Sequence, residues 1–258
     1  MRPLSLAARQ RLAVLAGLAG VTLLAWIYLL RMDADMQAAM AAGAVCELHP
    51  WTGADFAFTF AMWAVMMVGM MVPSAAPMSL LFAAVARRAR EQGSAVAPTF
   101  VFVSGYVAVW TLFSVAATAA QWSLEQAALL SPMLASTSPA FGGLLLAAAG
   151  IYQWTPWKDG CLDHCRAPAH FFASHWRDGA LGSFRMGAVH GLYCLGCCSV
   201  LMGLLFFGGV MNLLWVAGLT LFVLVEKVAP HGAAIGRLGG GVLLLAGGVR
   251  LAAWLTGS

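Results

Sequence analysis

Four side chains that can bind a soft metal ion are crowded into one hydrophobic stretch. The string HGLYCLGCC contains His190, Cys194, Cys197 and Cys198. In a helix, which turns by about 100° per residue, the first three lie within roughly 60° of one another, and Cys198 lies about 40° further round. A single membrane cysteine usually packs as a small hydrophobe. Three cysteines with a histidine one turn earlier favour a site for Cu(I) or Zn(II) instead.

A second group of such ligands lies in the string CLDHC, on a predicted cytoplasmic loop. If this string is helical, His164 and Cys165 lie three and four residues after Cys161, so the three side chains can converge. Zn(II) or Cu(I) would accept these ligands. The spacing is less diagnostic than paired CxxC motifs, so both a metal-binding and a structural interpretation stay open.

A third group consists of methionines. Met62, Met66 and Met70 recur every four residues and form a stripe on one side of a helix. Such a stripe usually provides adaptable packing, but thioethers also bind Cu(I). Pro73 and Ser74 follow the stripe, and a proline kink beside polar groups is typical of a functional cavity in lipid.

The remaining polar residues give weaker signals. Cys46 and His49 offer a thiol and an imidazole on the predicted outer side, either as a chance pair or as a point of metal uptake or release. Glu226 and Lys227 are expected to anchor a helix end at the membrane interface. The sequence contains no P-loop, no Rossmann glycine motif and no G-x-S-x-G motif, so it indicates no enzymatic reaction.

The composition indicates the kind of protein that carries these residues. Hydrophobic residues make up 62% of the 258 residues and charged residues only 9%. A soluble domain carries roughly a quarter charged residues, so this chain is neither a soluble globular protein nor a disordered one. A net charge of only +4 also argues against a nucleic-acid partner.

The elements that position the ligands are predicted to be transmembrane helices. A helix crosses the membrane with about 20 apolar residues, and the chain offers about seven such stretches. They are residues 12–30, 56–86, 97–119, 139–154, 183–207, 210–227 and 233–255. We therefore predict an all-α, polytopic bundle in the lipid bilayer. Pro73 and Pro77 are expected to kink the long second stretch.

The basic residues predict the orientation of the bundle in a bacterial inner membrane. They are concentrated in alternate connections: Arg2, Arg9 and Arg11; Arg87, Arg88 and Arg90; Lys158, Arg166, Arg177 and Arg185; Lys227 and Arg237. By the positive-inside rule the N-terminus is cytoplasmic and the C-terminus faces outward. The patterns Gly187-xxx-Gly191 and Gly236-xxx-Gly240 predict close helix packing.

Three strings together resemble DUF2182, a bacterial family of predicted metal-binding integral membrane proteins. They are MWAVMMVGMMVPSAAPM at 62–78, YQWTPWKDGCLDHCRAP at 152–168 and GLYCLGCCSVLM at 191–202, with MN..W at 211–215 and EK at 226–227. The resemblance implies a membrane bundle with metal ligands, sometimes associated with copper handling, and implies no reaction. Ser199 stands where the family pattern leads us to expect tryptophan.

The sequence thus predicts an anchor helix and outer loop (1–54), a metal-binding core (55–230) and a C-terminal transmembrane helix (231–258). The predicted function is handling of Cu(I), with Zn(II) second, for delivery to a metalloprotein or membrane complex or for transport. Two alternatives stay open. One is a thiol-disulfide oxidoreductase that uses the cysteine pairs. The other is a structural or assembly subunit whose cysteines only pack.

Overall fold

The described residues fold into helices joined by turns and loops. The computed structural model describes residues 6–42, 51–131 and 134–256. Within these ranges it contains α-helices, one short 3-10 helix and no strand beyond an isolated bridge between Leu130 and Ser136. The all-α prediction is confirmed.

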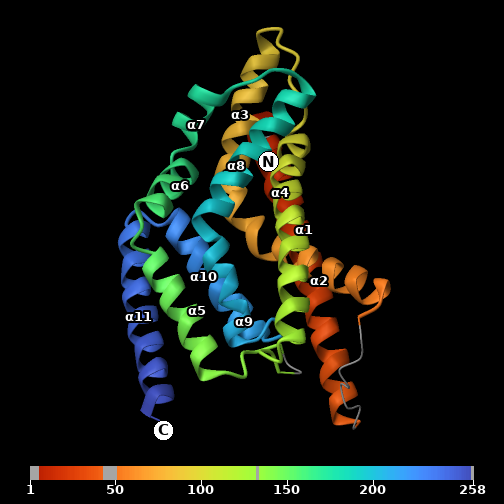
Figure 1. Cartoon of the computed structure of the whole chain (residues 1–258). Helices are drawn as coiled ribbons and strands as arrows, with labels where there is room; N and C mark the ends of the chain where they lie inside the picture. Colours follow the sequence, from red (N-terminus) through yellow and green to blue (C-terminus); the bar gives the residue numbers. More distant parts are fainter. Residues whose placement is uncertain (1–5, 43–50, 132–133, 257–258) are drawn as a thin grey trace, which may run out of the picture.

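Figure 1 shows the helices in chain order. Their bounds are α1 Leu6–Ala41, α2 Gly53–Met71, η1 Pro73–Ala75, α3 Ala76–Glu91, α4 Thr99–Gln126, α5 Pro139–Tyr152, α6 Pro156–Arg166, α7 Pro168–His175, α8 Gly179–Gly203, α9 Leu205–Gly208, α10 Leu213–Val228 and α11 Gly232–Thr256. Proline starts α5, α6 and α7, where its missing N–H costs no helical hydrogen bond.

The number of helices that can cross a membrane differs from the prediction. Five described helical stretches are long and apolar enough: Leu6–Ala41, Gly53–Met71, Thr99–Gln126, Gly179–Gly208 and Gly232–Thr256. The sequence predicted about seven. The other two predicted stretches form α5, with 14 residues, and α10, with 16 residues. A helix of that length spans at most about 24 Å, less than the roughly 30 Å of the hydrocarbon core.

The predicted kink at Pro73 is a complete break between two helices. Helix α2 ends at Met71, the 3-10 turn η1 follows, and α3 begins at Ala76. Pro73 has no N–H, so the carbonyl of Gly69 lacks its helical donor. The indole Nε1 of Trp26 donates to that carbonyl at 3.3 Å. This hydrogen bond from Trp26 connects α1 to α2 at the break, and the Gly69 carbonyl is not left unpaired.

Two helix pairs form the frame of the bundle, α4 with α8 and α5 with α11, and both are visible in Figure 1. At Gly187 of α8, an added Cβ would lie 1.8 Å from the carbonyl oxygen of Phe102 on α4. At Gly240 of α11, it would lie 3.1 Å from the carbonyl oxygen of Gly150 on α5. Both predicted glycine patterns are therefore confirmed as places of close helix approach.

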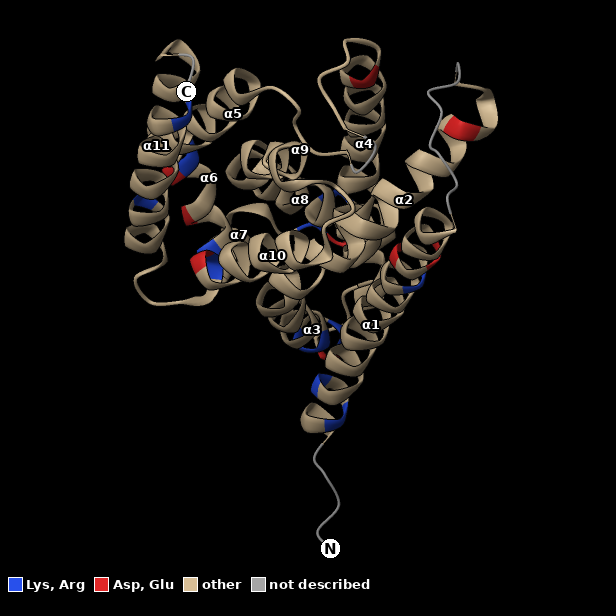
Figure 2. Cartoon of the chain, turned by 90° about the horizontal axis from the view of Figure 1, so that it is seen from below, with Lys and Arg blue, Asp and Glu red and all other residues tan. Residues whose placement is uncertain are grey.

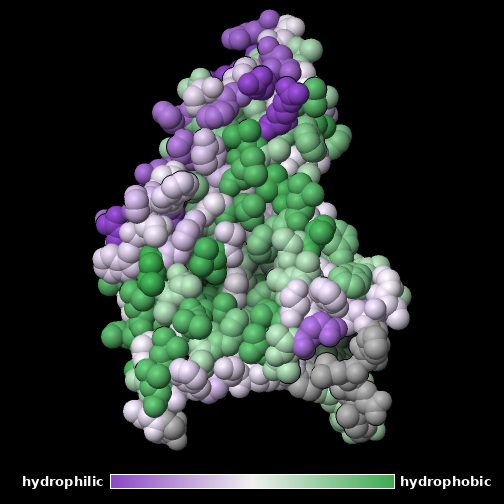
Figure 3. All heavy atoms as spheres, in the orientation of Figure 1, coloured by the Kyte–Doolittle hydropathy of each residue, from purple (hydrophilic) through white to green (hydrophobic). Residues whose placement is uncertain are grey.

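Charged and apolar side chains are segregated on the surface. Figure 3 shows hydrophilic side chains gathered at the end of the molecule where α3 and α7 lie, with mainly hydrophobic side chains over α4 and α5. Figure 2 shows basic residues gathered at one end of α1 and at the neighbouring end of α3. Gln10 connects the two helices by donating to Ala83 O and accepting from Arg87. This distribution fits helices inserted in a membrane.

The close approach of α4 and α8 predicts that substitution of Gly187 destabilises the fold. In Gly187→Ala the new methyl group collides with backbone rather than with a flexible side chain. Overpacking of this kind typically costs about 1–3 kcal/mol. Thermal unfolding in detergent should show a clearly lower Tm. The matched control is Gly203→Ala on the same helix, where no atom lies within 4 Å of the added Cβ. Equal Tm values for the two variants would contradict the packing argument.

Candidate metal centre

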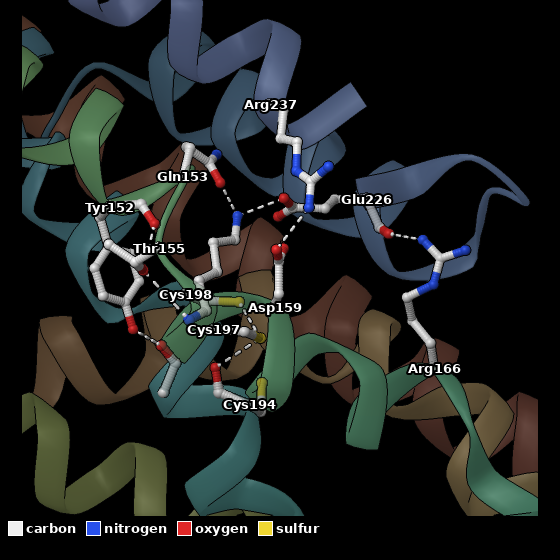
Figure 4. Close-up of polar contacts among 12 residues, drawn as sticks. Tyr152, Gln153, Thr155, Asp159, Arg166, Cys194, Cys197, Cys198, Glu226 and Arg237 are labelled. Carbon is white, nitrogen blue, oxygen red and sulfur yellow. Dashed lines mark hydrogen bonds and ion pairs between the residues drawn. The ribbon is translucent and has the colours of Figure 1, made fainter. Parts of the chain in front are cut away.

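The three cysteines of α8 lie together in the interior. Cys194, Cys197 and Cys198 each have 0% exposure. Cys197 Sγ lies 3.2 Å from Cys198 Sγ, and Cys194 is within hydrogen-bonding reach of both. Figure 4 shows the three sulfur atoms close to one another beside α8. The helix therefore turns these thiols toward a common space inside the bundle and not toward lipid.

Helix α6 brings the two other described cysteines to the same place. An added Cβ at Gly196 of α8 would lie 2.5 Å from Cys161 Sγ, and Cys165 packs against the hydrophobic cluster that contains Cys197. Cys161 and Cys165 are half-buried, and both pack against the core that contains the α8 cysteines. We call the five free cysteines of α6 and α8 the thiol cluster: Cys161, Cys165, Cys194, Cys197 and Cys198.

The two predicted histidine ligands have different surroundings. His190 of α8 is 3% exposed and stacks on Tyr106, with ring centroids 5.3 Å apart. Its Nδ1 is buried and has no hydrogen-bond partner among the described residues. His164 of α6 lies further out, stacked on Tyr193 at 4.2 Å, and its Nδ1 is 2.8 Å from the Gly160 carbonyl oxygen. His190 thus has a nitrogen available inside the bundle.

The methionine stripe of α2 is buried in the same core as the thiol cluster. Met62, Met66 and Met70 are 2%, 1% and 1% exposed. They belong to one hydrophobic cluster with the three cysteines of α8. The end of α2 is linked to Cys194 through Tyr106, whose hydroxyl donates to Met71 O at 3.0 Å and lies 3.0 Å from Cys194 Sγ.

Two residues beside Cys194, Lys227 and Tyr106, were not predicted from the sequence as parts of the site. Lys227 of α10 lies with its Nζ 2.7 Å from Cys194 Sγ and 3.2 Å from Ser74 Oγ, and Tyr106 contacts the same sulfur. Lys227 is 8% exposed and Glu226 only 1%. The expectation that this pair anchors a helix end at the membrane interface is therefore wrong. Successive residues of a helix point about 100° apart, so Glu226 and Lys227 face two different neighbouring helices.

Glu226 holds α6 in place through a buried ion pair. Its carboxylate accepts a hydrogen bond from Lys158 of α6, and both side chains are 1% exposed. Lys158 also donates to Gln153, and Figure 4 shows Gln153 and Glu226 turned toward each other. Arg166, at the end of α6, donates to the carbonyl oxygens of Glu226 and Ala229 at 2.7 Å each. These contacts fix the helix that carries Cys161 and Cys165.

The centre does not resemble a closed zinc site. In the part of the chain that the structure describes, no group of three or more His, Cys, Asp or Glu side chains is arranged to hold one metal ion. Structural zinc usually takes four such ligands in a tetrahedron. Cys46 and His49, the predicted outer pair, lie outside the described residues.

Residues 60–250 match the profile of PpoB2, a family described as a copper chaperone. The chain belongs to the PpoB2 copper chaperone family. The part that matches PpoB2 begins in α2 and ends in α11, so it contains the methionine stripe and the whole thiol cluster. No curated protein and no solved structure matches the chain. Membership of PpoB2 associates the chain with copper.

The buried ion pair predicts a large effect of removing one partner. Glu226→Leu leaves the Lys158 ammonium buried without its carboxylate, which typically costs about 3–5 kcal/mol. Removing both charges in Lys158→Met/Glu226→Leu should restore much of the stability. The check is thermal unfolding of both variants beside Arg237→Ala, which breaks the exposed Arg237–Asp159 pair and should change stability by less than about 1 kcal/mol. A single variant as stable as Arg237→Ala would refute the role of the pair.

The environment of Cys161 predicts slow reaction of its thiol at neutral pH. Partial burial raises the pKa of Cys161 above its ordinary value, because burial disfavours the charged thiolate. Only the thiolate reacts, so alkylation by iodoacetamide should be slower than that of free glutathione at neutral pH and should accelerate as the pH rises. Mass spectrometry of the peptide that contains Cys161 measures this rate. A rate equal to that of glutathione across the pH range would contradict the prediction.

Proposed function

We propose that the chain is a multi-pass protein of the bacterial inner membrane that binds Cu(I) and passes it on, as a chaperone or transport factor. The observation that carries this proposal is the meeting of five free thiols from α6 and α8 in a core that also contains buried methionines. Thiolates and thioethers are soft ligands that select Cu(I). Membership of the copper chaperone family and the resemblance to DUF2182 support the same metal.

The ligands are assigned to two stages and a relay. In this scheme the α6 set receives the ion, the α8 set holds it in the interior, and the α2 stripe relays it. The residues are Cys161, His164 and Cys165; His190, Cys194, Cys197 and Cys198; and Met62, Met66 and Met70. In this scheme each bound thiolate offsets the positive charge of the cation and reduces the cost of burying it.

The orientation follows from the sequence. The N-terminus is assigned to the cytoplasm by the positive-inside rule, and the basic residues Lys158 and Arg166 assign α6 to the same side, although α5 alone is too short to cross the membrane. Residues 55–230 form the metal-binding core, residues 1–54 the anchor with its outer loop, and residues 231–258 the terminal membrane helix. The recipient of the ion is a metalloprotein or a membrane complex.

Zn(II) is the second metal to consider. It binds thiolate and imidazole, but it favours four ligands in a tetrahedron. Among the described residues no group of even three His, Cys, Asp or Glu side chains is so arranged. Cu(I) can be bound by fewer soft ligands, and neighbouring methionine thioethers would assist its transfer.

The test is copper content. Purified full-length protein loaded with Cu(I) under anaerobic conditions should retain stoichiometric copper by inductively coupled plasma mass spectrometry. The triple variant Cys194→Ser/Cys197→Ser/Cys198→Ser should lose most of it, because a hydroxyl is a poor ligand for Cu(I). The matched control is Cys46→Ser, which removes a cysteine predicted to lie on the opposite side of the membrane.

The outcomes separate the proposal from its rivals. Equal, sub-stoichiometric copper in wild type and triple variant would reject metal binding by the cluster. Reversible disulfide formation in metal-free protein, seen as paired loss of alkylation, would favour a thiol-disulfide oxidoreductase instead. Replacement of all five cysteines without any change in metal content or partners would leave only a structural role.

A further inference from the structure

Lys227 is a buried cation whose neighbours are unusual. Its Nζ donates to Cys194 Sγ at 2.7 Å and to Ser74 Oγ at 3.2 Å, and the side chain is 8% exposed. Buried lysines in membrane proteins are rare and normally paired with an acid. Here the nearest available acid, Glu226, is bound to Lys158, and the described ion pairs include none for Lys227. Its partner is therefore the sulfur of a thiol cluster.

The position of Lys227 has a consequence for the charge of a bound metal. Two cysteines that bind one ion release two protons to solvent and contribute two negative charges. With Cu(I), the ion and the Lys227 ammonium contribute two positive charges, so the buried assembly is neutral. With Zn(II), the same assembly has a net charge of +1. Uncompensated charge away from water is costly, so the ammonium penalises the divalent ion.

We propose that Lys227 is the fixed counter-charge that makes the thiol cluster selective for a monovalent soft cation over a divalent one. This inference rests on the proposed function, because it requires a metal at the α8 thiols. It names the ion class that the site accepts, Cu(I) or Ag(I), and the residue that imposes the choice. Lys227 acts through charge and touches the ligand Cys194, so it is a specificity-determining residue and not itself a ligand.

The charge balance requires two of the three α8 thiols to bind the ion as thiolates while the third stays a neutral thiol. A site with three thiolates would reverse the argument, because Zn(II) and Lys227 would then make it neutral. The described residues contain no group of three or more His, Cys, Asp or Glu side chains arranged around one ion. Two thiolates from Cys194, Cys197 and Cys198, which are within hydrogen-bonding reach of one another, satisfy the balance.

A purely structural role for Lys227 makes a different prediction. Ser74 and Lys227 connect the break after α2 to α10, so loss of the lysine could merely loosen the bundle. Loosening would weaken the binding of all metals in parallel. Removal of the counter-charge would instead change the ratio of monovalent to divalent affinity. The ratio is therefore the decisive readout.

The experiment measures Ag(I) and Zn(II) binding by full-length protein in detergent, with Ag(I) used as a monovalent soft ion that is not oxidised. Wild type should bind Ag(I) and bind Zn(II) far more weakly. In Lys227→Met the ratio of Ag(I) to Zn(II) affinity should fall at least about tenfold, which corresponds to about 1.4 kcal/mol. Lys227→Gln is a second neutral variant and should show the same fall.

Two variants control for the loss of contacts. Lys227→Arg keeps the positive charge and should keep the ratio within about twofold. Ser74→Ala removes the other hydrogen-bond partner of Lys227 but leaves its charge, and it should also keep the preference for Ag(I). Size-exclusion chromatography identifies any variant that does not fold.

The failures of the two proposals are distinguishable. If wild type binds no Ag(I), or if Cys194→Ser binds it as well as wild type does, the proposed metal site is wrong. If wild type binds Ag(I) through Cys194 but the ratio is unchanged or raised in the neutral variants, the role of Lys227 is wrong. Wild-type protein that binds Zn(II) as tightly as Ag(I) overturns the charge argument without any variant.

Discussion

The arrangement of the bundle depends on the cost of a charged or polar group that is cut off from water. Such a group must find a partner inside the protein. Glu226 and Lys227 find their partners on different helices. Glu226 binds Lys158 of α6, and Lys227 binds Cys194 of α8. Two adjacent residues of α10 therefore tie together the two helices that carry the cysteines. Neither helix can shift without leaving a buried charge unpaired.

Small residues allow the helices to come close enough for these partners to meet. At Gly187 the backbones of α4 and α8 touch, which brings Tyr106 beside Cys194. At Gly196 a larger residue would collide with the Cys161 sulfur, so this glycine admits the α6 thiol to the cluster. Gly187, which the sequence marks as a packing residue, and Gly196, which it does not, thus also determine how near the ligands of different helices lie. The same close contacts therefore determine both the packing of the helices and the spacing of the candidate ligands.

Helical periodicity predicted part of this site, because it depends only on neighbours along the chain. It placed the cysteines of α8 on adjoining faces, and proline chemistry predicted a kink at Pro73, where the structure has a break between two helices. Apolar length did not distinguish a membrane span from the short helices α5 and α10, whose ends depend on their packing. Lys227 was misassigned because a charged pair near the end of an apolar stretch looks the same whether it faces solvent or a neighbouring helix. Only the tertiary fold distinguishes these cases.

A chaperone differs from a storage site in that it must release its ion. A tetrahedral set of four anionic or imidazole ligands would bind a metal tightly and release it slowly. The described residues provide no group of even three such ligands. They provide thiols on two helices with methionines in the same core, so several weak alternatives for a soft ion lie close together. In the proposed function, each ligand exchange replaces one sulfur by another of similar softness. In the proposed role of Lys227, its buried ammonium beside Cys194 then limits how much positive charge the site can hold.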